Sequence, residues 1–382
     1  MRFHPALLAV ILALLSCSAH SQIVVEPGGV YPTIQAGVDA ASATGGTVLV
    51  MPGVYTDSHL VEINWVVYRV QVYFEKGITL TSAGGPEVTI LDGGGVTDFG
   101  IVGLPYDMSV PGVPLPLATP IVEGFTVRNG RYSYPSKGIV AIAGEARDNI
   151  VSGYYFGLAS GFGHDYTGIS GGRSRDEVSL ITGNTATGNS SGVRIESMEE
   201  GFFEAHITGN TLTGNDYGVS ATGPDNRALL ADNEICDNGT GIFVQQGSST
   251  SSGLVHLEMV RNLIADNTSA NIRVYNAWSH GGHWTDLDIG GSPGNANDIY
   301  GAAQNVKVVV DGGMDVDVDA RYNYWGSVFC DEFVPLFSVS GAPDSLLQFL
   351  PYVDGTHTVV YEDCEYSAIE NVTWGAIKAL YR

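Results

Sequence analysis

The chain has 382 residues, of which 44% are hydrophobic and 15% charged, so it is long enough to bury a large core. Lysine and arginine total 17 against 41 aspartates and glutamates, which gives a formal net charge of −24. So acidic a surface argues against nucleic acid as a partner, because phosphates need clustered cations. It also disfavours polyanionic sugars unless a divalent cation bridges them. Fifty glycines favour short strands and tight turns over helices.

Residues 1–21 predict export. They hold a cationic start at Arg2, an apolar run over Ala6–Leu15 and an Ala-His-Ser cleavage site. The apolar run is too short to span a bilayer, and no later run approaches the necessary length. We therefore expect a protein that is secreted or held at the cell surface and is not transmembrane. The sequence Leu-Leu-Ser before Cys17 resembles a bacterial lipoprotein box, so lipid anchoring at Cys17 stays open as an alternative.

The mature N-terminus predicts a short helix followed by a buried strand. Apolar side chains at Ile34, Val38 and Ala41 have helical spacing, which places a helix at about residues 33–42. Two glycines stop the helix, and the strand Thr47–Met51 precedes Pro-Gly-Val-Tyr. This order of Thr-Ile-Gln, helix, Gly-Gly, strand and Pro-Gly-x-Tyr resembles the N-terminal cap of the pectate-lyase-like right-handed parallel β-helices. Such a helix would cover the open end of a stacked core.

One short pattern is written four times between residues 181 and 274. Each copy holds two asparagines that lie five residues apart, and the first of each pair are Asn184, Asn210, Asn233 and Asn262. A unit of this length cannot bury a core alone, so the copies must stack. The intervals of 26, 23 and 29 residues between these asparagines suit a parallel β-helix, in which one corner admits loops of any length. They argue against a strict-period solenoid.

Strand parity divides each copy into inward and outward positions, because successive side chains point to opposite faces. Four apolar columns face inward under this rule, and they begin at Ile181, Ala186, Val193 and Ile195. The asparagines fall at the corners between strands, where they can hydrogen-bond their neighbours from coil to coil. We therefore predict a structural asparagine ladder, with ligand contact as the alternative role.

The Asn-rich repeats resemble the right-handed β-helix repeats of bacterial surface and secreted proteins. With the cap, the resemblance implies an all-β fold: a single-stranded right-handed parallel β-helix (solenoid) over residues 22–327, with an N-terminal helical cap. The Asn-Tyr-Trp-Gly sequence that ends at Gly326 is typical of the last coil of such helices. Residues 328–382 would form a small C-terminal extension. Within it, Cys330 and Cys364 suit a disulfide in an exported protein.

The outward columns of the third strand in each coil offer a binding surface. The first column holds Arg194, Ser220, Phe243 and Arg273, and the second includes Gln245 and Tyr275 as outward neighbours. Strands lie about 4.8 Å apart, so three steps make a ladder of about 14 Å, the length of a few sugar rings. Aromatic rings stack on sugars and arginines bind carboxylates. The candidate ligand-binding residues are Arg194, Phe243, Gln245, Arg273 and Tyr275. Isolated exposed aromatics are the plainer interpretation.

Two groups of residues are candidates for metal binding. Asp315, Asp317 and Asp319 alternate with valines, so their carboxylates share one strand face, and a hard cation such as Ca²⁺ would suit two of them. A solvated outer face is the alternative. His280 and His283 precede Asp286 at a spacing that zinc accepts, but no fourth ligand or second shell accompanies them. No cofactor is required by any motif.

The sequence contains no recognised catalytic set. The Asp-Asp pair that hydrolases of this superfamily use is absent, and so is the Gln-Asp of the pectin methylesterases. No lysine lies between Lys137 and Lys307, which leaves Arg194 or Arg273 as the bases that a lyase needs on the ladder. Cys236 faces outward without a histidine partner.

We therefore expect a monomeric, exported, non-catalytic β-helix that binds carbohydrate or serves as a structural scaffold. A polysaccharide or another cell-surface component is the expected partner. The first alternative is a polysaccharide-active enzyme, a lyase or a related one, with an atypical site. The second is an adhesion or assembly module that works through the C-terminal extension.

Overall fold

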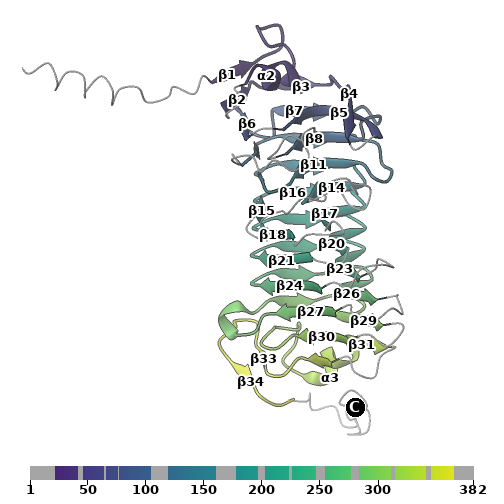
Figure 1. Cartoon of the computed structure of the whole chain (residues 1–382). Coiled ribbons are helices and arrows are strands. Elements are labelled where there is room, and N and C mark those ends of the chain that lie inside the picture. The colour runs from purple at the N-terminus through teal and green to yellow at the C-terminus, as the bar shows by residue number, and fades with distance from the viewer. Residues whose placement is uncertain are drawn as a thin grey trace, which may run out of the picture.

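The computed structural model describes residues 22–41, 46–63, 66–75, 77–104, 119–160, 178–196, 203–222, 226–246, 254–276, 284–310, 315–340 and 346–364. The predicted signal sequence and lipoprotein box lie outside these ranges, and so do His280 and His283. The described segments form a long column of stacked coils, with the N-terminal cap at one end and the disulfide-bonded segment at the other (Figure 1).

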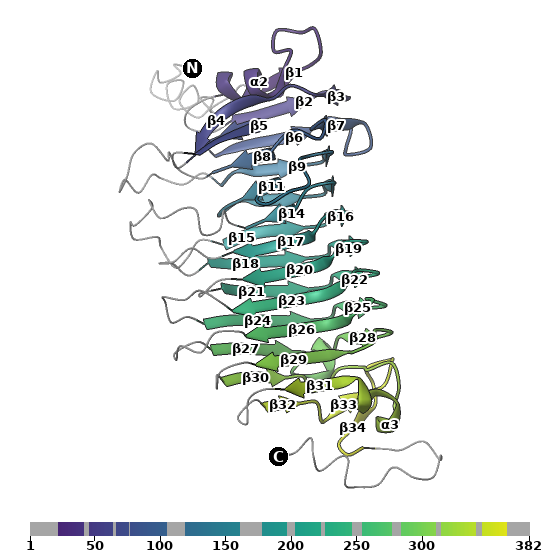
Figure 2. The same cartoon turned by 90° about the vertical axis from the view of Figure 1, so that its right-hand side faces the viewer.

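Three sheets run along the column (Figure 2), and each regular coil contributes one strand to each sheet. Neighbouring strands are parallel in all three sheets, except that the first two strands of sheet C, β4 and β5, pair antiparallel. Sheet A is β1 (Ile23–Val25), β2 (Gly46–Val50), β6 (Ile78–Ser82), β9 (Ile121–Glu123), β12 (Glu145–Arg147), β15 (Val178–Thr182), β18 (Phe203–Thr208), β21 (Asn226–Ala231), β24 (Leu254–Val260), β27 (Trp284–Ile289), β30 (Asp315–Asp319) and β32 (Leu346–Gln348). Sheet B is β3 (Gly53–Tyr55), β7 (Thr89–Asp92), β10 (Thr126–Arg128), β13 (Ile150–Ser152), β16 (Thr185–Thr187), β19 (Thr211–Thr213), β22 (Glu234–Cys236), β25 (Leu263–Ala265) and β28 (Asp298–Tyr300). Sheet C is β4 (His59–Ile63), β5 (Val66–Phe74), β8 (Phe99–Gly103), β11 (Lys137–Ala141), β14 (Phe156–Ala159), β17 (Ser191–Glu196), β20 (Tyr217–Thr222), β23 (Thr240–Gln246), β26 (Ala270–Asn276), β29 (Val306–Val310) and β31 (Phe337–Ser340).

A short helix closes the N-terminal end of the core. Helix α2 (Ile34–Ala40) begins after Thr33, whose hydroxyl accepts a hydrogen bond from the Ala36 backbone N–H at 3.1 Å. Its buried face packs on the same core as the first coils. The Gln35 side chain accepts from the Tyr73 N–H at 2.8 Å and donates to the Tyr73 carbonyl at 2.9 Å. The helix therefore satisfies edge groups of β5 and covers apolar side chains as well.

The inward columns predicted from parity form the core. The register pairs the members of each column on neighbouring strands, and all of them are 0–1% exposed. They are Ile181, Ile207, Leu230 and Met259 in sheet A, Ala186, Leu212, Ile235 and Ile264 in sheet B, and Val193, Val219, Ile242, Ile272, Ile195, Ala221, Val244 and Val274 in sheet C. Their near-complete burial is the main stabilising contribution, at about 1.5–3 kcal/mol for each large apolar side chain.

Two buried asparagine ladders run beside this core. In the ladder between sheets A and B, the backbone N–H and the side-chain amide of Asn184 both donate to Oδ1 of Asn210, at 2.9 and 3.1 Å. Asn210 repeats the same two bonds to Asn233. The ladder continues past the four sequence repeats. Its members are Asn149, Asn184, Asn210, Asn233, Asn262, Asn297 and Asn323.

The second ladder has a glycine column next to it. Asn189, Asn215, Asn238 and Asn267 form this ladder between sheets B and C. Three residues after an asparagine comes a glycine, as in Gly192, Gly218 and Gly241. A Cβ on Gly218 would lie 2.7 Å from the Gly241 carbonyl oxygen, so a side chain does not fit without a shift. The asparagines and the glycines together set the corner at which each coil enters sheet C.

The C-terminal extension continues the sheets before it closes them. Strands β31 and β32 add to sheets C and A, so two β-helix strands lie beyond residue 327, where the sequence pattern ended the β-helix. The difference arises because these strands lack the asparagine signature. Trp325 packs edge-on against Phe337, with ring centroids 4.8 Å apart, and plugs the last core layer.

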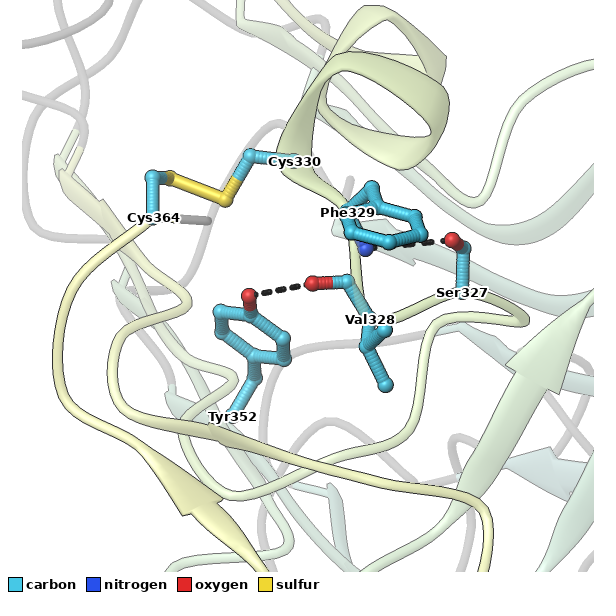
Figure 3. Close-up of a disulfide and its surroundings, with 6 residues drawn as sticks. All are labelled: Ser327, Val328, Phe329, Cys330, Tyr352 and Cys364. Carbon is cyan, nitrogen blue, oxygen red and sulfur yellow. Dashed lines mark hydrogen bonds between the residues drawn. A yellow bond between two sulfur atoms is a disulfide. The ribbon is translucent and has the colours of Figure 1, made fainter. Parts of the chain in front are cut away.

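A disulfide fastens this closure. Cys330 at the start of α3 (Cys330–Phe333) is bonded to Cys364, and their Cα atoms are 5.5 Å apart (Figure 3). Beside the disulfide, the Tyr352 hydroxyl donates to the Val328 carbonyl at 2.6 Å. The remaining described elements are η1 (Pro293–Asn295), η2 (Val334–Leu336), β33 (Tyr352–Val353) and β34 (Val360–Tyr361). Residues 365–382, the last part of the predicted C-terminal extension, lie outside the described residues.

Candidate functional site

The sheet C face is the outward surface of strands β11 to β29. Strand register aligns Arg194, Ser220, Phe243, Arg273 and Lys307 in one column. The column two residues further along contains Gln245 and Tyr275. The structure therefore brings the five predicted ligand-binding residues onto one surface, although the two ends of that surface differ.

A buried ion pair occupies the N-terminal end of the sheet C face. Lys137 and Glu196 have side chains only 1% and 4% exposed, and Nζ lies 2.9 Å from Oε2. Arg194 donates from Nε to the other Glu196 oxygen at 2.9 Å, and its guanidinium carbon lies 4.9 Å from the centre of the Phe156 ring. Burial by itself raises the pKa of the Glu196 carboxyl, but the two cations and their hydrogen bonds hold that pKa below its ordinary value. Arg194 therefore already has a carboxylate partner within the protein, which it shares with Lys137.

An open aromatic and cationic cluster occupies the C-terminal end of the same face. Phe243 stacks on Tyr217 with centroids 4.8 Å apart. The guanidinium carbon of Arg273 lies 5.7 Å from the centre of the Phe243 ring and 6.0 Å from that of Tyr275. The Nε atom of Arg273 is buried and has no hydrogen-bond partner. Lys307 lies on the next strand, in register with Arg273.

Arg273 and Lys307 differ from most cationic side chains of the described segments in having no carboxylate partner. Seven cationic side chains in the described segments have a carboxylate partner: Arg128, Arg131, Lys137, Arg147, Arg194, Arg261 and Arg321. Arg273 and Lys307 make no ion pair with any described residue, although the chain carries a net charge of −24. Two adjacent unneutralised cations beside aromatic rings are a suitable receptor for an anionic ligand.

The outward face of sheet A has the opposite character. His256, Asp286 and Asp317 stand in one column on strands β24, β27 and β30, and Glu258, Asp288 and Asp319 stand in the next. The Nδ1 atom of His256 lies 3.0 Å from an Asp286 oxygen, and its Nε2 lies 4.0 Å from an Asp288 oxygen. We call His256, Asp286 and Asp288 the sheet A triad. One ligand atom from each lies within 4.8 Å of those of the other two.

Electrostatics in this region favour a cation. Burial first, and then the neighbouring carboxylate of Asp286, raise the pKa of Asp288, and the His256 charge opposes them. Burial also raises the pKa of Asp317, with Asp286 and Asp319 adding to it. Like charges on adjacent strands each disfavour the ionised form of the other.

The aspartates of the predicted calcium site have different surroundings in the structure. Asp317 faces outward beside Asp286. Asp319 forms an ion pair with Arg321, whose Nε donates to the Asp319 carboxylate at 2.8 Å. The side chain of Asp315 lies outside the described residues. Sequence reasoning missed His256, which is supplied by a different strand. Its signal was the alternation in Val-His-Leu-Glu over residues 255–258, which places His256 outward.

Cys236, the cysteine left free by the disulfide, is half-buried in sheet B. Burial, which is the largest cause, raises the pKa of its thiol. A raised pKa reduces the thiolate fraction, which makes the thiol a poor nucleophile. Within the described ranges, no helix has the length and apolar character that crossing a membrane requires.

A family model described as "Periplasmic copper-binding protein (NosD)" matches residues 116–284, less than half of the chain. Two solved structures from Azotobacter vinelandii are similar. The mannuronan C-5 epimerase AlgE4 A-module is 18% identical with a TM-score of 0.43, over 76% of this chain and 73% of that one. The AlgE6 A-module is 17% identical with a TM-score of 0.45, over 82% of this chain and 93% of that one. At these values the likeness says nothing about activity. No curated protein matches the sequence.

The three parallel sheets, the asparagine ladders and the family match lead to one classification. The sheets are long and continuous, and the described helices are short. The matched range contains all four sequence repeats, which lie between residues 181 and 274. The chain is a right-handed parallel β-helix repeat protein of the Asn-rich type.

Proposed function

We propose that this protein is an exported, non-catalytic β-helix that binds a carboxylate-bearing glycan on the sheet C face. Arg273 and Lys307 contact the carboxylates, while Phe243 and Tyr275 pack against the sugar rings. Gln245, half-buried on the same strand as Phe243, offers an amide to a sugar hydroxyl. The rigid ladder holds these groups in fixed positions, so binding orders few side chains.

The unpartnered Nε of Arg273 is the observation that carries this proposal. A buried donor without a hydrogen bond costs about 1–3 kcal/mol, and more when it belongs to a charged group. A ligand carboxylate that approaches the guanidinium pairs with the charge, and a rotation of the half-buried side chain would let Nε donate to the same carboxylate. Carboxylates accept two parallel hydrogen bonds from arginine, which also fixes the orientation of the sugar.

The net charge of −24 opposes the approach of a polyanion, and the local charges overcome it at short range. At physiological ionic strength, exposed charges separated by more than about 8 Å are largely screened. A carboxylate on the sheet C face therefore interacts mainly with Arg273 and Lys307. Lower salt should strengthen the repulsion by the rest of the molecule more than the local contacts.

Two features support a binding protein over an enzyme. A lyase needs a base that is free to accept a proton, and Lys137 and Arg194 are both paired with Glu196. Arg273 is unpaired, but no tyrosine, histidine or carboxylate is bonded to it within the described residues to complete an acid–base set.

Export is supported by the N-terminal sequence and by the first word of the family description, "periplasmic". Cell fractionation with an antibody against the chain tests it. Recovery of the protein from the cytoplasm at its full unprocessed mass would contradict export.

The glycan proposal is tested with polygalacturonate and its fully methyl-esterified form, which differ in charge but share a backbone. Calorimetry should show binding of the acid form, with a loss of at least about tenfold in Arg273→Ala, since a charged hydrogen bond contributes about 1.5–3 kcal/mol. Arg261→Ala is the matched control, because Arg261 is exposed and paired with Asp232.

Equal binding by the Arg273→Ala protein would refute the site. Ultraviolet absorbance from unsaturated products during the same incubation would contradict the non-catalytic assignment in favour of a lyase. Absence of binding to either polymer and to a wider array of acidic glycans would leave a structural scaffold as the function.

A further inference from the structure

We propose that the sheet A triad of His256, Asp286 and Asp288 binds one divalent transition-metal ion. This site is independent of the glycan proposal, because it lies on a different sheet and uses none of the same residues. It also does not rest on the family description, since the matched range ends at residue 284, before both aspartates.

The first argument is the arrangement of the donors. Adjacent strands of one rigid sheet position them, with His256 on β24 and both aspartates on β27. The two ring nitrogens of His256 lie 3.0 and 4.0 Å from oxygens of Asp286 and Asp288. The three ligand atoms lie within 4.8 Å of one another, a span that one ion can bridge after small rotations of the side chains.

The second argument is that no described lysine or arginine forms an ion pair with the two aspartates of the triad. Asp319, in the next coil, is neutralised by Arg321. Asp286 and Asp288 have no lysine or arginine partner in the described segments, and the His256 ring is the group that contacts both. Glu258 and Asp317 add negative charge from the flanking positions.

The imidazole decides the class of metal. Ca²⁺ and Mg²⁺ prefer sets made entirely of oxygen ligands, whereas one nitrogen and two carboxylate oxygens suit Zn²⁺, Cu²⁺ and similar ions. Side-chain exposures of 28% for His256, 44% for Asp286 and 52% for Asp288 leave the remaining coordination positions to water. The site therefore has the open form of an accessible metal centre, not a closed structural one.

The chain contains its own control on the same face. His206 lies 2.9 Å from Glu204 on β18 and is 35% exposed, much like His256. The strand that follows His206 places Arg227 in register with Glu204. The strand that follows His256 instead carries the two aspartates of the triad. The His206 pair therefore provides one carboxylate, and a cation competes for it.

The test uses the full chain, purified without a histidine tag and freed of metal. Titration calorimetry with ZnCl₂, CuCl₂ and CaCl₂ should show one site for zinc and copper and no comparable site for calcium. His256→Gln and Asp286→Asn should each weaken zinc binding at least about tenfold, the range seen for loss of metal-site groups. His206→Gln should leave it unchanged.

Electron paramagnetic resonance of the Cu²⁺ complex gives a second readout. It should show coupling to a single imidazole, and His256→Gln should remove that coupling. Unchanged stoichiometry in His256→Gln would place the ion elsewhere and overturn the proposal. Calcium binding that survives His256→Gln but fails in Asp286→Asn would also overturn it, because the site would then be a simple acidic patch. Far-ultraviolet circular dichroism confirms that each variant is folded.

Discussion

The outward faces of sheets A and C share one scaffold and yet carry opposite chemistry. Their inward columns are both apolar and 0–1% exposed. On the outward side, sheet A presents His256 with Asp286 and Asp288, whereas sheet C presents Arg273 and Lys307 among aromatic rings. Packing constrains all the inward positions, whereas the outward positions around Arg273 and His256 are only partly buried. The fold and the binding chemistry are therefore specified by alternate residues of the same strands.

The sheet C face contains a second contrast, between a closed end and an open end. At the closed end, Arg194 and Lys137 share Glu196. At the open end, Arg273 has an unpartnered Nε and lies against Phe243. Two arginines in one outward column thus have different roles, one structural and one available to a ligand.

Breaking the closed end should have the largest effect. Glu196→Gln leaves the buried Lys137 ammonium without this carboxylate and takes the same partner from Arg194, so we expect a loss of about 3–5 kcal/mol in the free energy of unfolding. Urea denaturation measures it. The double variant Lys137→Met/Glu196→Gln should recover part of the loss, because the ammonium that is 1% exposed is then removed with its carboxylate and only Arg194, which is 16% exposed, lacks its partner. A loss below about 1 kcal/mol in the single variant would mean that the pair is not buried as described.

A substitution in the asparagine ladder should cause the next largest loss of stability. Because the ladder belongs to the scaffold that sheets A and C share, the loss should affect both of their outward faces. Asn210→Ala removes the oxygen that accepts from Asn184 and the amide that donates to Asn233. We expect a loss of about 2–3 kcal/mol, since a buried donor left without its acceptor costs about 1–3 kcal/mol. Thr208→Ala, at an outward position of the same coil, is the control and should change the urea midpoint little. An unchanged midpoint in Asn210→Ala would contradict a stabilising ladder.

A substitution in the sheet A triad should have the smallest effect on stability, and it should stabilise the protein where the other substitutions destabilise it. The folded-state pKa of Asp288 is raised, so its contribution to stability is full below the unfolded pKa and is lost as the pH rises through the folded pKa. In metal-free protein, Asp288→Asn should therefore raise the melting temperature near neutral pH, and the difference should vanish at acidic pH. Calorimetric scans across this range measure it.

Glu196 provides the matched comparison for that pH series. Its folded-state pKa is lowered, so its stabilising contribution is present above the unfolded pKa and is lost as the pH falls through the folded pKa. Glu196→Gln should thus destabilise the protein most near neutral pH. If both variants shifted the melting temperature in the same direction at neutral pH, the electrostatic contrast between the faces would be wrong.

The fold was largely predictable, because its signals are local and repeated. Alternation alone places Ile181 and Val193 inward, and the five-residue spacing of asparagines places Asn184 and Asn189 at corners. The cap helix follows from apolar spacing around Ile34. Each of these signals depends on residues within a single coil.

The site was less predictable, because its contacts join different coils. Lys137 and Glu196 are 59 residues apart, and parity alone indicated only that Glu196 faces outward, not that it is buried. His256 and Asp286 meet only once the register of β24 and β27 is known. The intervening loops vary in length, so spacing along the sequence does not reveal which outward residues become neighbours.

The Gln35 contact at the N-terminal cap has a consequence for self-association. β4 pairs with β5 over Val66–Val70, and the Gln35 amide pairs with Tyr73 further along the same strand. An uncovered strand at the end of a stack is a template on which another chain can extend the sheet, as in fibre growth. By occupying that position with its own side chain, the cap removes the Tyr73 backbone groups as a place where another chain could extend the sheet.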